Sequence, residues 1–162
     1  QLGAWEYDIT SLGYKCNMTN LMAALGLAQL ERYPSLLARR REIVERYDAN
    51  LKDSGIQCMH HYSENCSSSA HLYLVRIPNA NEERRNQIIT RMAEEGVATN
   101  VHYKPLPMMS AYKELGFQIS DYPNAFHQYE NEISLPIYTT LTNEQVDYIC
   151  DNLKAIMHEV NA

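Results

Sequence analysis

The residues best suited to chemistry are histidines next to predicted strands. His60 and His61 are adjacent, and neighbouring residues of a strand point to opposite faces, so these two side chains cannot easily share one metal ion. His71 and His102 lie on or beside other predicted strands, but no cluster of Asp and Glu near them completes a tetrahedral site. We therefore favour polar histidines bonded to the backbone at strand ends, and we expect no metal site.

Motifs for nucleophilic catalysis or phosphate binding do not occur. Ser67–Ser69 lack the G-x-S-x-G setting of a nucleophilic serine, and Cys66 lies in a polar stretch with no flanking glycine motif. The sequence contains neither G-x-G-x-x-G nor a P-loop. The run Arg39–Arg41 is interpreted as a solvated helix face that pairs with Glu42 and Glu45, and an anion site is the alternative.

The segment V-H-Y-K-P-L-P, which begins at Val101, is the best candidate for a ligand contact. It follows a predicted strand, and loops after strands are common ligand sites in α/β folds. His102 offers a titratable ring to a polar substrate, and Tyr103 offers a phenol.

The pattern of apolar residues predicts a helical front and an α/β body. Thr19 or Asn20 caps a first helix that runs to about Tyr33, and Pro34 suits the first turn of a second helix that Gly55 stops. The body contains a strand over 71–77, a helix over 81–95 and a strand over 97–102, which together form a βαβ-like unit or part of a split one. The other expected elements are a strand over 56–60, a polar loop over 62–69, helices over 108–115 and 122–131, an extended segment over 134–138, and a last helix that opens with the capping box of Thr142 and Gln145.

Composition excludes several classes of protein. The 162 residues carry a net charge of −6, which argues against a nucleic-acid-binding face and against a polybasic membrane contact. No apolar run reaches the length of a membrane span. The four cysteines show no C-x-x-C spacing, so we expect free thiols in a reducing, cytoplasmic compartment. The chain begins at Gln1 without Met, which either processing or a start inside a larger protein would explain.

Several motifs, taken in order, closely resemble the DegT/DnrJ/StrS family of PLP-dependent sugar aminotransferases. The blocks cover nearly the whole chain: L-G-Y-K-C-N-M-T-N from Leu12, A-A-L-G-L-A-Q-L-E-R from Ala23, R-R-R-E-I-V-E-R-Y from Arg39, H-L-Y-L-V-R from His71, G-V-A-T-N-V-H-Y-K-P-L-P from Gly96, A-Y-K-E-L-G from Ala111, Y-P-N-A from Tyr122, S-L-P-I-Y from Ser134 and L-T-N-E-Q-V-D-Y-I from Leu141.

The resemblance implies the C-terminal small domain of a fold-type I aminotransferase. The expected fold class is α/β (α+β), with a small, mostly antiparallel sheet, helices packed on it and a helical arm before it. We expect an interface loop and two connecting helices over residues 1–54 and the small domain over residues 55–162.

The resemblance also implies an activity. The family works as homodimers and moves an amino group, usually from glutamate, to a nucleotide-linked keto-sugar by imine chemistry on PLP. Its catalytic lysine lies upstream of the matched region, so we expect no catalytic residue here, no PLP bound by this chain alone, and an inactive isolated chain. None of the lysines matches the imine-forming motif: Lys15, Lys52, Lys104, Lys113 and Lys154.

Four positions carry over from the family as site residues. Asn17 matches a polar contact in a loop that reaches the neighbouring subunit's cofactor phosphate, although a turn residue is an equal alternative. Lys15 occupies a variable position of the same loop. His102 and Tyr103 match the substrate-side His-Tyr pair, with a holding role. The sequence Met108-Met109 departs from the family, which often has a polar residue there.

Two other functions remain open at this stage. A non-enzymatic dimerisation or binding module could use the same fold, with residues 19–52 as the partner surface. A separately folded metal hydrolase is the third possibility. We also expect that Trp5 and the apolar first helix promote association.

Overall fold

The computed structural model describes residues 11–161, which belong to two compact units. The first unit ends at Pro34 and the second begins at Ser35. This division differs in position from the domain boundary expected near residues 54 and 55, which stays a prediction. Trp5 lies outside the described residues.

Helix α1 (Asn20–Leu51) is one continuous element, so the prediction of two helices separated at Pro34 is wrong. Thr19 caps it as expected, because its Oγ1 accepts a hydrogen bond from the backbone N–H of Met22 at 3.3 Å. Proline removes one backbone donor, but its ring fixes φ near the helical value, so a helix can continue through it at the loss of that bond. The boundary between the two compact units coincides with this proline.

The sheet is small and antiparallel, as predicted. Its strands are β1 (Gln57–Cys58), β4 (Tyr73–Arg76) and β5 (Glu132–Leu135), in the order β1-β4-β5. Ser134 of β5 pairs with Leu74 of β4 and also forms an antiparallel bridge with Asn100. The segment around Asn100 therefore runs parallel to β4 with β5 between them, which is the split β-α-β arrangement. Together these features confirm the predicted fold class.

The strand predicted over 97–102 is reduced to that single bridge at Asn100. The start of the segment instead completes the end of α2 (Glu82–Glu94). Gly96 has φ of 74°, its N–H donates to the carbonyl of Ala93 at 3.0 Å, and the Val97 N–H donates to the carbonyl of Met92 at 2.9 Å. This pair of bonds is a Schellman motif, which uses backbone groups that a strand would need.

The polar loop predicted over 62–69 contains a short hairpin. Strands β2 (Tyr62–Ser63) and β3 (Cys66–Ser67) pair antiparallel. Two-residue strands are too short to produce an alternating pattern of apolar residues, so the sequence carries no periodic signal for them.

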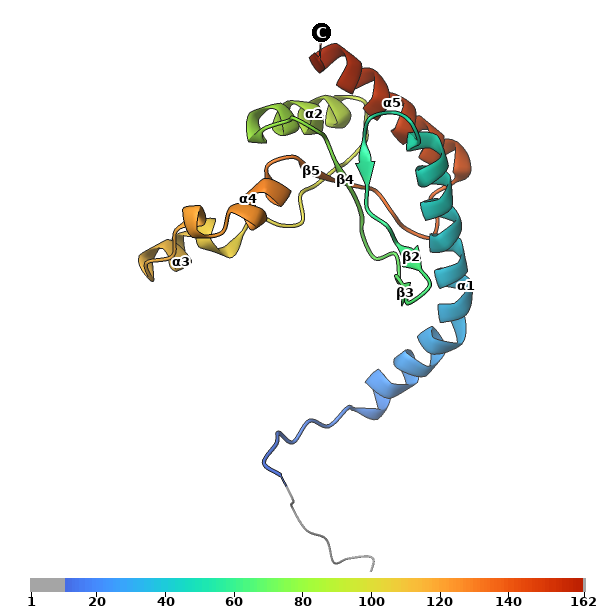
Figure 1. The fold of residues 1–162 in the computed structure, drawn as a ribbon. Coiled ribbons are helices and arrows are strands. Elements are labelled where there is room, and N and C mark those ends of the chain that lie inside the picture. The colour runs from blue at the N-terminus through green and yellow to red at the C-terminus, as the bar shows by residue number, and fades with distance from the viewer. Residues whose placement is uncertain (1–10, 162) are drawn as a thin grey trace, which may run out of the picture. The chain divides into compact units, whose positions relative to one another are not determined.

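One hydrophobic core joins the sheet to three helices. It includes residues of α1, β4, β5, α2 and α5 (Asn143–Asn161), and helices α2 and α5 lie side by side (Figure 1). Tyr47 of α1 stacks on Tyr73 of β4 with 4.6 Å between ring centroids. The Tyr47 hydroxyl donates to the carbonyl of Pro136 at 2.7 Å, so this buried phenol is satisfied.

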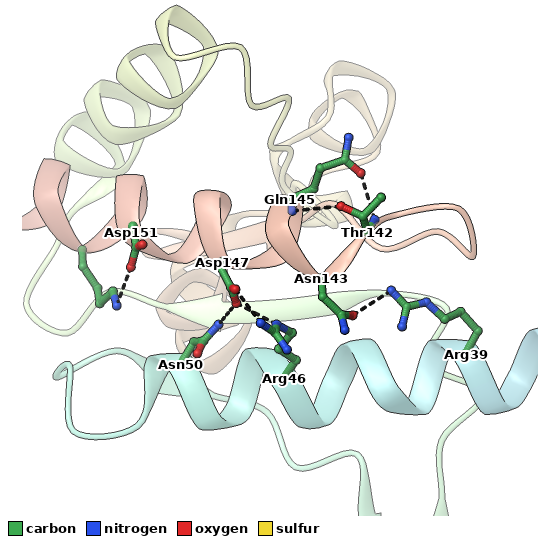
Figure 2. A network of polar contacts seen from close by, with 9 residues as sticks. Arg39, Arg46, Asn50, Thr142, Asn143, Gln145, Asp147 and Asp151 are labelled. Atoms are coloured by element: carbon green, nitrogen blue, oxygen red, sulfur yellow. Dashed lines mark hydrogen bonds and ion pairs between the residues drawn. The ribbon is translucent and has the colours of Figure 1, made fainter.

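A polar network joins the second half of α1 to α5 (Figure 2). Arg46 donates through Nε to Asp147 Oδ1 at 2.7 Å, and Asn50 Nδ2 donates to the same oxygen at 2.6 Å. The predicted capping box is confirmed, since the Thr142 N–H donates to Gln145 Oε1 at 2.9 Å and the Gln145 N–H to Thr142 Oγ1 at 3.2 Å.

Four short helical elements connect the Asn100 segment to β5. They are η1 (Leu106–Met108), α3 (Ser110–Glu114), η2 (Ile119–Asp121) and α4 (Pro123–Tyr129). Within residues 11–161, no helix is long and apolar enough to cross a membrane.

Candidate functional site

The pairing of strand β5 determines where His102 lies. The Asn100–Ser134 bridge is antiparallel, so two further residues along the chain bring His102 opposite Glu132. Glu132 and Ser134 are two residues apart in β5 and therefore point to the same face of the strand. Both side chains lie within hydrogen-bonding distance of His102, at the start of the V-H-Y-K-P-L-P loop.

These three residues form a connected chain of hydrogen bonds. The backbone N–H of His102 donates to Glu132 Oε2 at 2.9 Å. The Ser134 hydroxyl donates to Glu132 Oε1 at 2.6 Å, and His102 Nδ1 lies 2.7 Å from Ser134 Oγ. Glu132 is only 1% exposed and Ser134 only 4% exposed, so the support for His102 is buried. Buried polar groups with satisfied partners hold a defined geometry, and the His102 ring is therefore fixed.

Tyr103 lies next to this ring and faces solvent. Its ring makes an edge-to-face contact with the His102 ring, with 4.6 Å between centroids and an angle of 81°. The Tyr103 side chain is 72% exposed, so its hydroxyl is available to a ligand. Met108 is half-buried and Met109 is exposed at the end of the same loop. The predicted pair thus consists of a fixed imidazole and an accessible phenol.

Lys15 and Asn17 occupy a different part of the chain. Both are exposed in the extended stretch before α1, in the first compact unit. No tertiary hydrogen bond within the described chain defines a pocket for either side chain. Their expected role toward a cofactor phosphate therefore stays a prediction.

The lysines of this chain lie in different surroundings. Lys52 lines a cavity of about 330 Å³ together with Asp48 and Asp53, whose carboxylates would oppose a phosphate group. Lys154 forms an ion pair with Asp151 at 2.9 Å, and Lys15, Lys104 and Lys113 lie on the exposed surface. The expectation that this chain alone binds no PLP stays a prediction.

The arginine run contributes to structure more than expected for a solvated face. Arg39 pairs with Glu42 at 2.8 Å, as predicted, and Arg40 donates to the backbone carbonyl of Ala70 at 2.7 Å. Arg41 lies over the Tyr62 ring at 4.4 Å from its centroid. These guanidinium groups join α1 to neighbouring segments, which argues against the anion-site alternative.

Two of the thiols lie in surroundings that keep them protonated. Burial raises the pKa of the Cys150 thiol to about 12 and also raises the pKa of Cys58, so neither group is a thiolate at neutral pH. No group of three or more metal-binding side chains occurs within residues 11–161.

Sequence reasoning missed Glu132 and Ser134 as members of this site. Ser134 was recognised only as the start of the S-L-P-I-Y block, and Glu132 belonged to no motif. An available signal was the i, i+2 spacing of two polar residues in a strand otherwise rich in apolar residues. Their contact with His102 depends on the pairing of segments about 30 residues apart, as the bridge shows.

Comparison with known proteins gives one matching family and similar solved structures. Residues 3–154 match the DegT/DnrJ/EryC1/StrS aminotransferase family. The Streptococcus pneumoniae protein Spr1654, classed as a sugar aminotransferase and solved in its PMP form, is 53% identical, with a TM-score of 0.87 over 99% of this chain and 40% of that one.

Two curated relatives are similar over a comparable region. The spore coat polysaccharide biosynthesis protein SpsC of Bacillus subtilis is 32% identical over 96% of this chain and 41% of its own length. The UDP-4-amino-4,6-dideoxy-N-acetyl-beta-L-altrosamine transaminase of Helicobacter pylori is 30% identical over 92% of this chain and 40% of its own length. The chain therefore spans about two fifths of the length of the relatives it matches.

Proposed function

Because the chain belongs to the DegT/DnrJ/EryC1/StrS aminotransferase family, we propose that it is the C-terminal part of a sugar aminotransferase that uses PLP. The reaction proposed for the whole enzyme moves an amino group from glutamate to a nucleotide-linked keto-sugar. The similarity to a UDP-sugar transaminase supports this substrate class. The covalent chemistry, which PLP supplies, is assigned to residues outside this chain.

The observation that carries the proposal is the fixed His102 ring beside the accessible Tyr103 hydroxyl. A ring held by buried groups and an exposed phenol suit the orientation of a polar, uncharged ligand such as a sugar. Holding the substrate in one orientation lowers the entropic part of the barrier even when the holding residues exchange no bonds. This chain would therefore supply the substrate side of the site.

A homodimer and a cytoplasmic location are parts of the same proposal. In such a dimer, Lys15 and Asn17 would approach the phosphate of the cofactor in the other subunit. The length that the chain shares with its relatives supports the view that further residues complete the enzyme.

The test compares the 162-residue chain with the product of the whole reading frame that contains it. Each protein is mixed with PLP, L-glutamate and keto-sugars linked to UDP, GDP or dTDP, and formation of 2-oxoglutarate is measured. We expect turnover only from the longer protein. We also expect no imine absorbance when PLP is added to the short chain, because none of its lysines matches the imine-forming motif.

A site variant sharpens this test. In the longer protein, His102→Ala should lower kcat/KM for the keto-sugar roughly tenfold, the effect of losing one good hydrogen bond. His158→Ala, on the exposed face of α5, is the matched control and should leave the rate unchanged. Turnover by the short chain would disprove the fragment assignment, and a longer protein inactive with all three sugars would disprove the function.

A non-enzymatic binding module remains the second candidate because α1 exposes apolar side chains before Pro34. The large exposed ones are Leu21, Met22, Leu25, Leu27, Leu30 and Tyr33. Such a surface normally contacts a partner. The same activity comparison separates the two candidates, since a binding module predicts no turnover from either protein.

A further inference from the structure

The hydrogen-bond chain behind His102 specifies which ring nitrogen carries the proton. A carboxylate can only accept hydrogen bonds, and a serine hydroxyl has one hydrogen to donate. The Ser134 hydroxyl uses that hydrogen toward Glu132 Oε1 at 2.6 Å. At its contact with His102 Nδ1, 2.7 Å away, Ser134 must therefore act as the acceptor. The proton of the neutral imidazole is consequently on Nδ1.

The second oxygen of Glu132 strengthens this assignment. Glu132 Oε2 accepts from the backbone N–H of His102 at 2.9 Å, so the carboxylate holds both the backbone and, through Ser134, the ring of the same residue. Glu132 and Ser134 are nearly inaccessible to solvent, so bulk water competes little for either bond. The ring is thus held in one tautomer as well as one orientation.

We propose that Glu132 and Ser134 are positioning residues that hold His102 with its proton on Nδ1, so that Nε2 presents a lone pair to the substrate. This inference rests on the proposed function for the identity of that substrate. Within residues 11–161, no side chain supplies a hydrogen-bond partner to His102 Nε2.

A lone pair on Nε2 selects the part of the ligand that it can contact. It accepts from a hydroxyl or an amide N–H and repels a phosphate or carboxylate oxygen. A nucleotide-linked sugar carries both kinds of group. The tautomer assigns His102 to a hydroxyl or amide of the substrate and not to its diphosphate. Tyr103, whose hydroxyl both donates and accepts, can bind a neighbouring oxygen of the same ligand.

The tautomer can be measured directly on the 162-residue chain by NMR. Two-bond correlations between the nitrogens of the imidazole ring and its carbon-bound protons show which nitrogen is protonated. The spectrum is recorded at a pH at which the His102 ring is seen to be neutral. We expect a protonated Nδ1 and an unprotonated Nε2 for His102. A protonated Nε2 in the unmodified chain would overturn the proposal.

Two variants test the roles of the supporting residues. Ser134→Ala removes the acceptor and leaves the backbone pairing of β5 intact, so the His102 ring should change toward the Nε2–H form that free histidine prefers in water. Glu132→Gln should reverse the serine, because the new amide donates to Ser134 and turns its hydroxyl hydrogen toward His102 Nδ1. We therefore expect a protonated His102 Nε2 in Glu132→Gln as well, although this variant keeps a hydrogen-bonding side chain at position 132.

Ser120→Ala in η2 is the control, since Ser120 is exposed and should leave the His102 spectrum unchanged. An unchanged tautomer in folded Ser134→Ala would disprove the positioning role, and if Glu132→Gln does not fold, the serine variant still decides. The measurement needs neither cofactor nor substrate. An inactive longer protein together with the expected tautomer would therefore disprove only the proposed function. Turnover by the longer protein together with a protonated Nε2 on His102 would disprove only this inference.

Discussion

At the scale of single residues, His61 shows how burial changes the chemistry of a histidine. Its ring lies parallel to the Tyr73 ring, with 5.4 Å between centroids, and its Nδ1 is 3.2 Å from Ser68 Oγ. Burial lowers the pKa of His61, an effect that the charge of Asp48 only partly opposes. The folded chain therefore favours the neutral ring.

This shift predicts a dependence of stability on pH. The unfolded chain binds a proton at His61 near the ordinary pKa of about 6.5, whereas the folded chain binds it only at lower pH. The contribution of the neutral His61 ring to the free energy of unfolding is therefore complete above pH of about 6.5. It is lost as the pH falls through the pKa that His61 has in the folded chain. His61→Phe, which keeps a ring against Tyr73, should remove up to one proton, or about 1.4 kcal/mol per pH unit, from this slope.

Urea unfolding at a series of pH values measures the slope for both proteins. His60→Phe is the matched control, because His60 is the exposed neighbour. Equal slopes for the unmodified chain and His61→Phe would show that burial of His61 does not couple to protonation.

At the scale of elements, helix ends were easier to predict than strands. Asn81 caps α2 through a 2.9 Å bond from the Arg84 N–H to its Oδ1, and the Schellman motif at Gly96 ends the same helix. These ends depend on residues within a few positions of one another. Strand pairing depends on distant partners, which explains why the local pattern over residues 97–102 did not show that the segment forms only a bridge.

The capping box of α5 gives a prediction at this scale. Thr142→Ala removes the side-chain acceptor for the Gln145 N–H and should lower the free energy of unfolding by about 1 kcal/mol. Thr142→Ser keeps the hydroxyl and should retain most of the stability. Thr140→Ala, at an exposed position just before the box, is the control. Denaturant midpoints that coincide for the alanine and serine variants would contradict a capping role.

At the scale of the second compact unit, the contact between α1 and α5 is electrostatic as well as apolar. Hydrogen bonds from Arg46 and Asn50 lower the pKa of Asp147 to about 2 (Figure 2). The ordinary pKa of an aspartate is about 3.9. The contribution of the Asp147 carboxylate to the free energy of unfolding is therefore fully present above pH of about 4. It is lost as the pH falls toward the pKa that Asp147 has in the folded chain.

Asp147→Asn should consequently be less stable than the unmodified chain at neutral pH, and this difference should shrink between pH of about 4 and 2. Thermal unfolding across that range measures the change. Asp151→Asn is the control, because Asp151 pairs with Lys154 within the same helix and joins no second element. A difference for Asp147→Asn that stays constant down to the lowest pH would rule out this role for its charge.

The sequence by itself determined the family, most helix ends and, through the family resemblance, the small antiparallel sheet. Family motifs, the apolar run over residues 71–77 and caps such as Thr142 are all local in the chain. His102 and Tyr103 are adjacent in the chain and their rings are in contact, and their role toward a substrate stays a prediction. Local patterns carry this information because hydrogen bonds of caps and the faces of strands depend on neighbouring residues.

Only the tertiary structure decided what supports His102 and whether α1 continues through Pro34. Glu132 and Ser134 meet His102 through the antiparallel register of β5, and no motif near His102 specifies that register. The continuity of α1 depends on whether the free energy gained from its helical turns exceeds the cost of losing one backbone hydrogen bond at Pro34. Both outcomes depend on contacts or free-energy differences that the local sequence pattern does not contain. The position of the proton on His102 therefore follows only from the pairing of β5 with the Asn100 segment.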